Sequence, residues 1–114
     1  MTGTFNKAII AGRLGSDPEI RVTASGNEIA NLSIATNEYF KNKEGERQER
    51  TDWHRAVIFS DSLVSNVVKP YLRKGSSVLI EGPIRTDSYE KDGETRYTQE
   101  IIVTELRLMD SKKS

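Results

Sequence analysis

The chain has 114 residues, with 17 Lys and Arg against 17 Asp and Glu, so its formal net charge is zero. This length suits one domain, and the charge balance argues against nucleic-acid binding by bulk charge alone, although basic groups can still converge on one groove. The absence of Cys excludes disulfides, and a single His makes a zinc site unexpected. No membrane span or signal peptide is recognisable, so we expect a cytoplasmic protein.

The first third of the chain has the pattern of strands. An apolar run at residues 8–11 precedes a turn at residues 15–18, where Pro18 fixes φ and Asp17 can bond to its own backbone. Extended structure is expected again at residues 19–23, followed by a second turn at residues 25–27. Ala30, Leu32 and Ile34 then alternate with polar or small residues, which is strand periodicity.

Residues 39–50 form a long polar connection with Gly45 near its middle. Because it joins two predicted strands, we expect a protruding hairpin. Phe40 lies at the base of this hairpin, where no core requires an aromatic ring. Loops that project from a rigid sheet often carry binding residues, so Phe40 is a candidate for binding.

Residues 51–59 contain the only Trp and the only His, within a β-branched and aromatic run typical of a strand. Alternation gives this strand two faces, one with Trp53, Arg55, Val57 and Phe59, and the other with His54, Ala56 and Ile58. Two rings with a guanidinium between them suit a single-stranded nucleic acid, because a base stacks on the ring and a phosphate pairs with the cation. The alternative is that Trp53 and Phe59 are ordinary core residues.

A short helix is expected next. Ser60, Asp61 and Ser62 are N-cap candidates, and apolar residues follow at helical spacing as far as residue 72. Pro70 is expected to end or kink the helix, and Gly75 marks its exit. Arg73 and Lys74 then either complement the dipole at the helix C-terminus or contact a phosphate.

Two further strands complete the domain. Residues 77–85 form one strand, in which Gly82 and Pro83 imply a bulge or an edge. Tyr89 lies just before Asp92-Gly93, a strong hairpin signal. Residues 95–109 are expected to form the last strand, and residues 110–114 a short flexible end.

The order of three strands, a helix and two strands predicts an all-β fold, a five-stranded Greek-key OB-fold barrel with long hairpins spanning residues 1–109. This fold binds oligonucleotides on the face of its second and third strands and through nearby loops. Trp53 and Phe59 belong to the third strand, Phe40 to the hairpin before it and Tyr89 to the last hairpin. All four rings therefore fall where the fold has its binding surface, which favours the binding interpretation over the core one.

Several motifs occur in a recognisable order: Asn6-Lys7, residues 12–21, Asp52-Trp53-His54-Arg55, and residues 71–76, 81–86 and 92–98. Together they resemble the bacterial-type single-stranded DNA-binding protein family over nearly the whole domain. The resemblance implies a homotetramer that binds and protects single-stranded DNA in replication, recombination and repair, with no cofactor and no catalysis. No single motif suffices, but the ordered set is specific.

The resemblance also assigns roles to individual residues. It implies base stacking by Phe40, Trp53, Phe59 and Tyr89, although the family commonly has Trp where Phe40 and Tyr89 stand. It implies a basic path for the DNA strand along Lys7, Arg21, Arg55, Arg73, Lys74 and Arg85, for which plain surface charge is the alternative. His54 matches a position buried between subunits.

Two departures from the family stand out. Residues 60–62 replace a shorter and often basic start of the helix, so one phosphate contact is expected to be missing there. The family usually continues into a disordered tail whose acidic tip recruits other genome-maintenance proteins, whereas this sequence ends at Ser114 after Lys112 and Lys113. Recruitment is therefore not carried over, and the sequence does not distinguish a shortened chain from a natural lack of the tail.

Three other functions compete with this interpretation. A metal-dependent nuclease needs converging carboxylates, but no acidic residues here have a recognisable ligand spacing. An OB-fold that serves protein assembly is compatible with the neutral charge. RNA binding also remains open, because nothing in the sequence identifies a reader of the 2′-hydroxyl.

Overall fold

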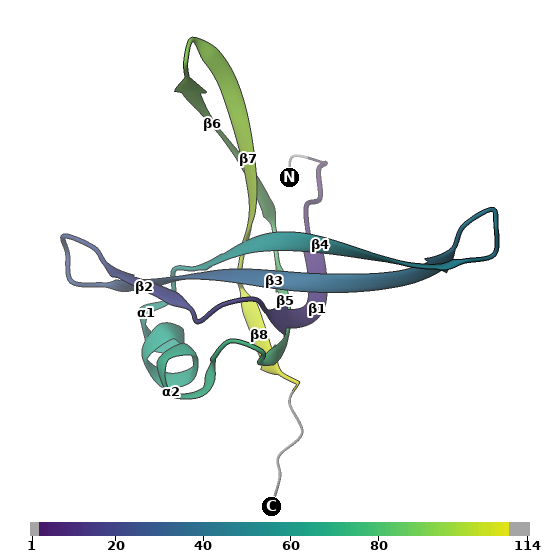
Figure 1. The fold of residues 1–114 in the computed structure, drawn as a ribbon. Coiled ribbons are helices and arrows are strands. Elements are labelled where there is room, and N and C mark those ends of the chain that lie inside the picture. The colour runs from purple at the N-terminus through teal and green to yellow at the C-terminus, as the bar shows by residue number, and fades with distance from the viewer. Residues whose placement is uncertain (1–2, 110–114) are drawn as a thin grey trace, which may run out of the picture.

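The computed structural model describes residues 3–109, and in this part of the chain the structure is mostly strand (Figure 1). The eight strands of the described residues are β1 (Ala8–Leu14), β2 (Glu19–Val22), β3 (Glu28–Lys41), β4 (Arg47–Ile58), β5 (Ser77–Gly82), β6 (Ile84–Lys91), β7 (Glu94–Ile102) and β8 (Glu105–Leu108). The flexible end predicted at residues 110–114 lies outside the described residues.

The eight strands are segments of five long, bent strands. The chain bends between β1 and β2, between β5 and β6 at Pro83, and between β7 and β8. The prediction of one unbroken last strand over residues 95–109 is wrong, because the chain changes partners there. The Val103 N–H donates to the Val57 carbonyl of β4, and the next N–H, of Thr104, donates to the Glu81 carbonyl of β5.

The pairing order is that of a Greek-key barrel. Neighbouring strands follow the path β6-β7-β4-β3-β1-β5-β8, and β2 pairs separately with β3. All pairs are antiparallel except β4 with β7, where Ala56 lies opposite Ile101 in a parallel register. The two strands at the ends of this path lie next to strands in its interior along the chain: β6 directly follows β5, and β8 directly follows β7. The sheet therefore curls into the partly open barrel of an OB-fold. The predicted fold class is confirmed.

One helical segment connects β4 to β5. It consists of α1 (Asp61–Leu63), the π-helical turn η1 (Val64–Val68) and α2 (Lys69–Tyr71), and the Ser60 hydroxyl caps it by accepting the Leu63 N–H. Pro70 was expected to end or kink the helix, and α2 ends one residue later, at Tyr71. A proline lacks an N–H and clashes with the carbonyl four residues earlier, and the wider π turn that precedes Pro70, where the Lys69 N–H bonds to the Val64 carbonyl, changes this spacing.

The core is filled by the inward residues of the strands and by one stripe of the helix. In the inner part of β3 every second side chain is buried, as the alternation predicts, whereas β4 buries three consecutive residues at its end, Ala56, Val57 and Ile58. The buried cluster consists of Leu14, Ala30, Leu32, Ile34, Ala56, Ile58, Val64, Val68, Leu72, Val78, Ile80, Ile101 and Val103. This cluster occupies only the barrel, so the outer ends of the strands contribute no side chain to it.

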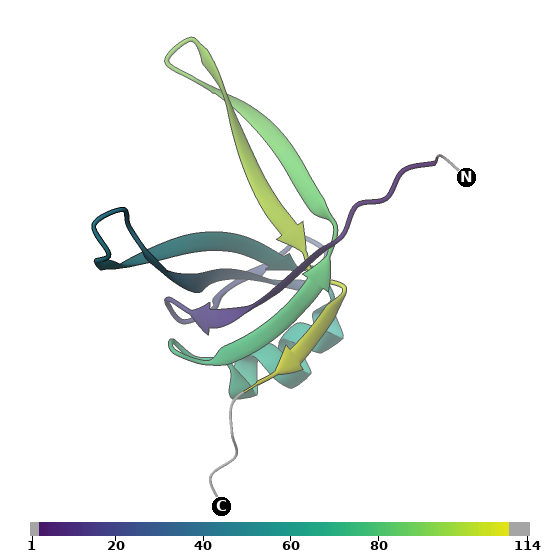
Figure 2. The ribbon, with the colours of Figure 1, turned by 90° about the vertical axis from the view of Figure 1, so that its right-hand side faces the viewer.

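Two hairpins extend far beyond the barrel, one made of β3 and β4 and one of β6 and β7 (Figures 1 and 2). They diverge from the barrel, with the helix on its other side. The radius of gyration is 16.7 Å, whereas a compact domain of this length has about 13 Å. Residues 39–50, predicted to be a polar connection, are paired strand almost to the tip, and the turn follows Lys41 and ends at Glu46.

The bend at Pro83 depends on Gly82. A Cβ atom on Gly82 would overlap the Ile102 carbonyl oxygen and lie 3.2 Å from the Thr104 nitrogen, both of them backbone atoms. We therefore expect Gly82→Ala to lower the free energy of unfolding by about 1–3 kcal/mol, as measured by urea denaturation. Ser88→Ala, on the exposed part of β6, is the control and should change it by less than about 0.5 kcal/mol. An unchanged urea midpoint for Gly82→Ala would contradict this packing.

Candidate nucleic-acid interface

The outer face of β4 presents Trp53 and Arg55 to solvent, while Ala56 and Ile58 point into the core. This is the alternation expected from the sequence. Val57 differs from the expectation, because by alternation it lies on the same face of the strand as Trp53 and Arg55 and yet is buried. It lies where β7 joins the edge of β4, since Val57 pairs with Ile102. The exposed face of β4 is therefore shorter than predicted.

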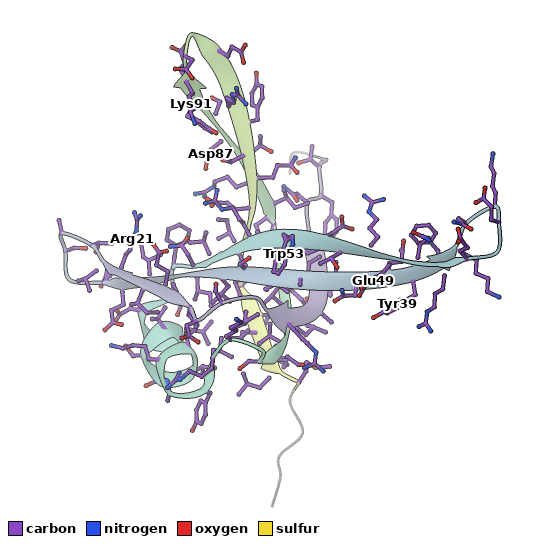
Figure 3. The ribbon with its side chains drawn as sticks, in the orientation of Figure 1. Arg21, Tyr39, Glu49, Trp53, Asp87 and Lys91 are labelled. Carbon is purple, nitrogen blue, oxygen red and sulfur yellow. The ribbon has the colours of Figure 1, made fainter. Side chains whose placement is uncertain are left out.

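The indole of Trp53 lies against the backbone of Gly15. A Cβ atom on Gly15 would overlap the Cζ3 atom of Trp53 and lie 2.8 Å from its Cη2 atom, so only glycine leaves room for the ring there. On the neighbouring strand the residue paired with Trp53 is the small Ala35. The ring is thus supported on one side by backbone, and Trp53 still exposes 62% of its surface. Figure 3 shows Trp53 at the middle of β4.

The four rings singled out by the sequence are all on the surface. Trp53 is 62% exposed, Phe40 47%, Phe59 45% and Tyr89 47%. They lie on different elements: Trp53 in β4 on the barrel wall, Phe59 directly after β4, which ends one residue earlier than predicted, Phe40 in the β3–β4 hairpin and Tyr89 in the β6–β7 hairpin. In the β3–β4 register, Phe40 pairs with Gln48 and Trp53 with Ala35, so the two rings emerge from opposite faces of the paired strands.

Two of the predicted basic residues are brought together. Arg21 of β2 and Arg55 of β4 line one hollow of about 250 Å³ together with Glu19 and Asn31. Glu19 lies 3.6 Å from the Arg21 Nε atom, a long and solvent-exposed pair of little strength. Both guanidinium groups therefore remain available on the same side of the barrel as Trp53.

Lys7 and Arg73 have partners within the chain. The Lys7 ammonium lies 2.8 Å from Glu81, and this hydrogen bond raises the pKa of Lys7. The Arg73 guanidinium donates to the Lys69 carbonyl at 2.9 Å and to the Leu72 carbonyl at 2.7 Å. Arg73 therefore satisfies carbonyls at the helix C-terminus, which was the alternative to a phosphate contact.

Lys74 and Arg85 are exposed and lie apart from the hollow. The backbone N–H of Lys74 donates to the Asp17 carboxylate at 2.8 Å, so the bond fixes the loop and not the side chain. Arg85 lies on β6 opposite Glu100 of β7. Of the six predicted basic residues, Arg21 and Arg55 therefore lie close together, Lys7 and Arg73 already have partners within the chain, and Lys74 and Arg85 lie on separate surfaces.

His54 is half-buried, and its Nε2 atom lies 2.9 Å from the Thr36 hydroxyl. It borders a hollow of about 270 Å³ at the base of the two hairpins, lined also by Ile10, Trp53 and Ile84. The imidazole has a hydrogen-bond partner within its own chain. Its location at a contact between subunits stays a prediction.

The sequence analysis missed Tyr39. The guanidinium of Arg47 lies over its ring, 4.7 Å from the centroid, and a hydrogen bond to the Glu49 carboxylate raises the pKa of the Tyr39 hydroxyl. Tyr39 was passed over because residues 39–50 were interpreted as loop, where side-chain alternation carries no information. Tyr97 of β7 is also highly exposed.

Within residues 3–109 no three His, Asp or Glu side chains gather in a way that would hold a metal ion. The helical segment in this part of the chain is too short to cross a bilayer. The surface just described offers exposed rings, of which Trp53 lies on the Gly15 backbone, with the guanidinium groups of Arg21 and Arg55 on the same side of the barrel. Exposed rings and guanidinium groups are the side chains that suit the stacking of planar groups and the pairing of anions.

The chain has relatives among known proteins. Residues 5–109 match the model of the single-strand binding protein family. The single-stranded DNA-binding protein of Rickettsia felis is 48% identical over the whole of this chain and 78% of its own length, and that of Rickettsia conorii is 47% identical over the same shares.

Solved structures show the same fold. The Plasmodium falciparum SSB in complex with ssDNA superposes with a TM-score of 0.87 at 31% identity, over 96% of this chain and 99% of that one. A deletion mutant of the Thermus aquaticus single-stranded DNA binding protein gives 0.77 at 23% identity, over 95% of this chain and 52% of that one, which shows likeness of fold alone. The chain therefore belongs to the single-strand binding protein family.

Proposed function

We propose that this protein binds single-stranded DNA without sequence preference and protects it during replication, recombination and repair. The observation that carries the proposal is the Trp53 indole, which lies on glycine backbone and exposes 62% of the residue on the barrel wall, two positions from Arg55. Duplex DNA hides its base faces, so a surface that works by stacking selects unpaired strands. Membership of the family and the likeness to a protein solved with ssDNA support this function.

Stacking supplies the part of the affinity that does not depend on salt. Each base stacked on an aromatic side chain contributes about 1–3 kcal/mol, whatever the base. We assign this role to Trp53, Phe59, Phe40 and Tyr89. Because the rings lie on the wall and on both hairpins, the bound strand has to run over the barrel and along the hairpins.

Phosphate contacts supply the salt-dependent part. We assign them to Arg21 and Arg55, which share a hollow, and to the exposed Lys74 and Arg85. Lys7 and Arg73 belong to the same proposed path, but each must first exchange its partner, Glu81 or the helix carbonyls, for a phosphate. Those two contacts are therefore the weakest of the set.

The binding is passive and needs no cofactor. We further propose a cytoplasmic homotetramer with His54 at a subunit contact, in which several subunits bind one strand and gain affinity through high effective concentration. Recruitment of other replication and repair proteins is not part of the proposal.

The only Trp makes stacking directly observable. Titration with a dT oligomer should quench the fluorescence of Trp53, and Trp53→Leu should weaken binding about five- to 150-fold, the equivalent of one lost stacked base. Trp53→Phe keeps a smaller ring and should lose less. Anisotropy of a labelled oligomer measures the affinity. Equal affinity in the wild type and Trp53→Leu would contradict stacking on this residue, and no binding even at low salt would favour a protein-assembly module.

Arg55 should affect the salt dependence of binding. Neutralising one phosphate contact on a single strand changes the slope of log K against log salt by about 0.7. Arg55→Gln should therefore lower the slope by about that amount, measured by titrations between 50 and about 300 mM salt. Arg107→Gln on β8, an exposed guanidinium beside Glu105 that is not part of the proposed path, is the control. If both variants keep the wild-type slope, Arg55 makes no phosphate contact.

A further inference from the structure

The β3–β4 hairpin carries aromatic rings on both of its faces. Tyr39 and Phe40 are neighbours in β3, so their side chains point to opposite sides of the paired strands. Tyr39 is 57% exposed, more than Phe40. In the pairing register Tyr39 lies opposite Glu49, on the same face of the two strands as Trp53 and Ala35. This face turns with the twist of the hairpin (Figure 3).

The two faces differ in charge. The Tyr39 face carries Lys41 and Arg47, which lie opposite each other, and one acidic residue, Glu49. The Phe40 face carries Glu38 and Asp52 with one basic residue, Arg50. Arg50 is 3.3 Å from Asp52, so its charge is already paired. A polyanion that follows the hairpin is therefore better accommodated on the Tyr39 face.

The Tyr39 ring is held by its neighbours. The Asn37 amide donates to Glu49 at 2.9 Å and to Thr51 at 2.8 Å, which fixes the Glu49 carboxylate that accepts the Tyr39 hydroxyl. Arg47 lies 4.7 Å from the ring centroid on one side. A ring that is already oriented loses little conformational entropy when a base stacks on it. A tyrosine hydroxyl is protonated at neutral pH, so the ring offered to a base is uncharged.

We propose that Tyr39 is a further base-stacking residue, which binds an unpaired base on the ring face not covered by Arg47. This inference rests on the proposed function. A DNA strand that leaves Trp53 can pass over the paired residues Asn37 and Thr51 and reach Tyr39. Arg47 and Lys41 lie farther along the hairpin, where they can pair with the next phosphate. Positions 35 and 39 of β3 lie about 13 Å apart along an extended strand, a distance that a few nucleotides span.

The test compares leucine and phenylalanine at this position. Tyr39→Leu should weaken the binding of a dT oligomer of about eight bases, short enough for one OB-fold, by about five- to 150-fold. The slope of log K against log salt should not change, because no charge is removed. Tyr39→Phe keeps the ring and should stay within about threefold of the wild type. Tyr71→Leu, at an equally exposed tyrosine in α2, should have no effect.

An affinity of Tyr39→Leu within twofold of the wild type would overturn the inference, and so would an equal loss in Tyr39→Phe or in Tyr71→Leu. Tyr39 lies outside the core cluster, so thermal unfolding of Tyr39→Leu should match the wild type. Trp53 quenching separates the two proposals. If the wild-type protein quenches and binds while Tyr39→Leu is unchanged, only this inference fails, whereas a wild type that neither binds nor quenches overturns the proposed function itself.

Discussion

The antiparallel pairing of β3 with β4 is the constraint on which the rest of the structure depends. Twelve residue pairs run without interruption from Ala30 and Ile58 to Lys41 and Arg47. The inner half of this ladder supplies Leu32, Ile34 and Ile58 to the core, so the barrel holds it rigidly. The outer half continues into solvent as a hairpin. One ladder thus links the packing of the domain to the position of its exposed rings.

Exposed rings require support that the core does not provide. Trp53 rests on the backbone of Gly15 and opposite Ala35, and Tyr39 is held by Arg47 and Glu49. In both cases the neighbours orient the ring and leave much of it in water. Such orientation lowers the entropy lost when a base stacks. Small residues near Trp53 and polar residues near Tyr39 therefore serve the same purpose on the wall and on the hairpin.

The sequence predicted what depends on local pattern. The alternation along residues 51–59 predicted that Trp53 and Ile58 lie on opposite faces of the strand, and the order of the elements predicted the OB-fold. It failed where a partner distant in sequence decides the outcome. Val57 is buried where β7 joins β4, and the Lys7 ammonium is engaged by Glu81. Tyr39 was missed because its segment was interpreted as a polar connection and its strand alternation was not considered.

Binding by stacking is distinguished most directly from binding by charge with a strand that lacks bases. An abasic oligomer has the same phosphates as a dT oligomer of equal length but nothing to stack on the rings. At equal salt, the account predicts that the abasic oligomer binds at least tenfold more weakly than the dT oligomer, since each stacked base contributes about 1–3 kcal/mol, and that it leaves the fluorescence of Trp53 unquenched. Equal affinities for the two oligomers would contradict it.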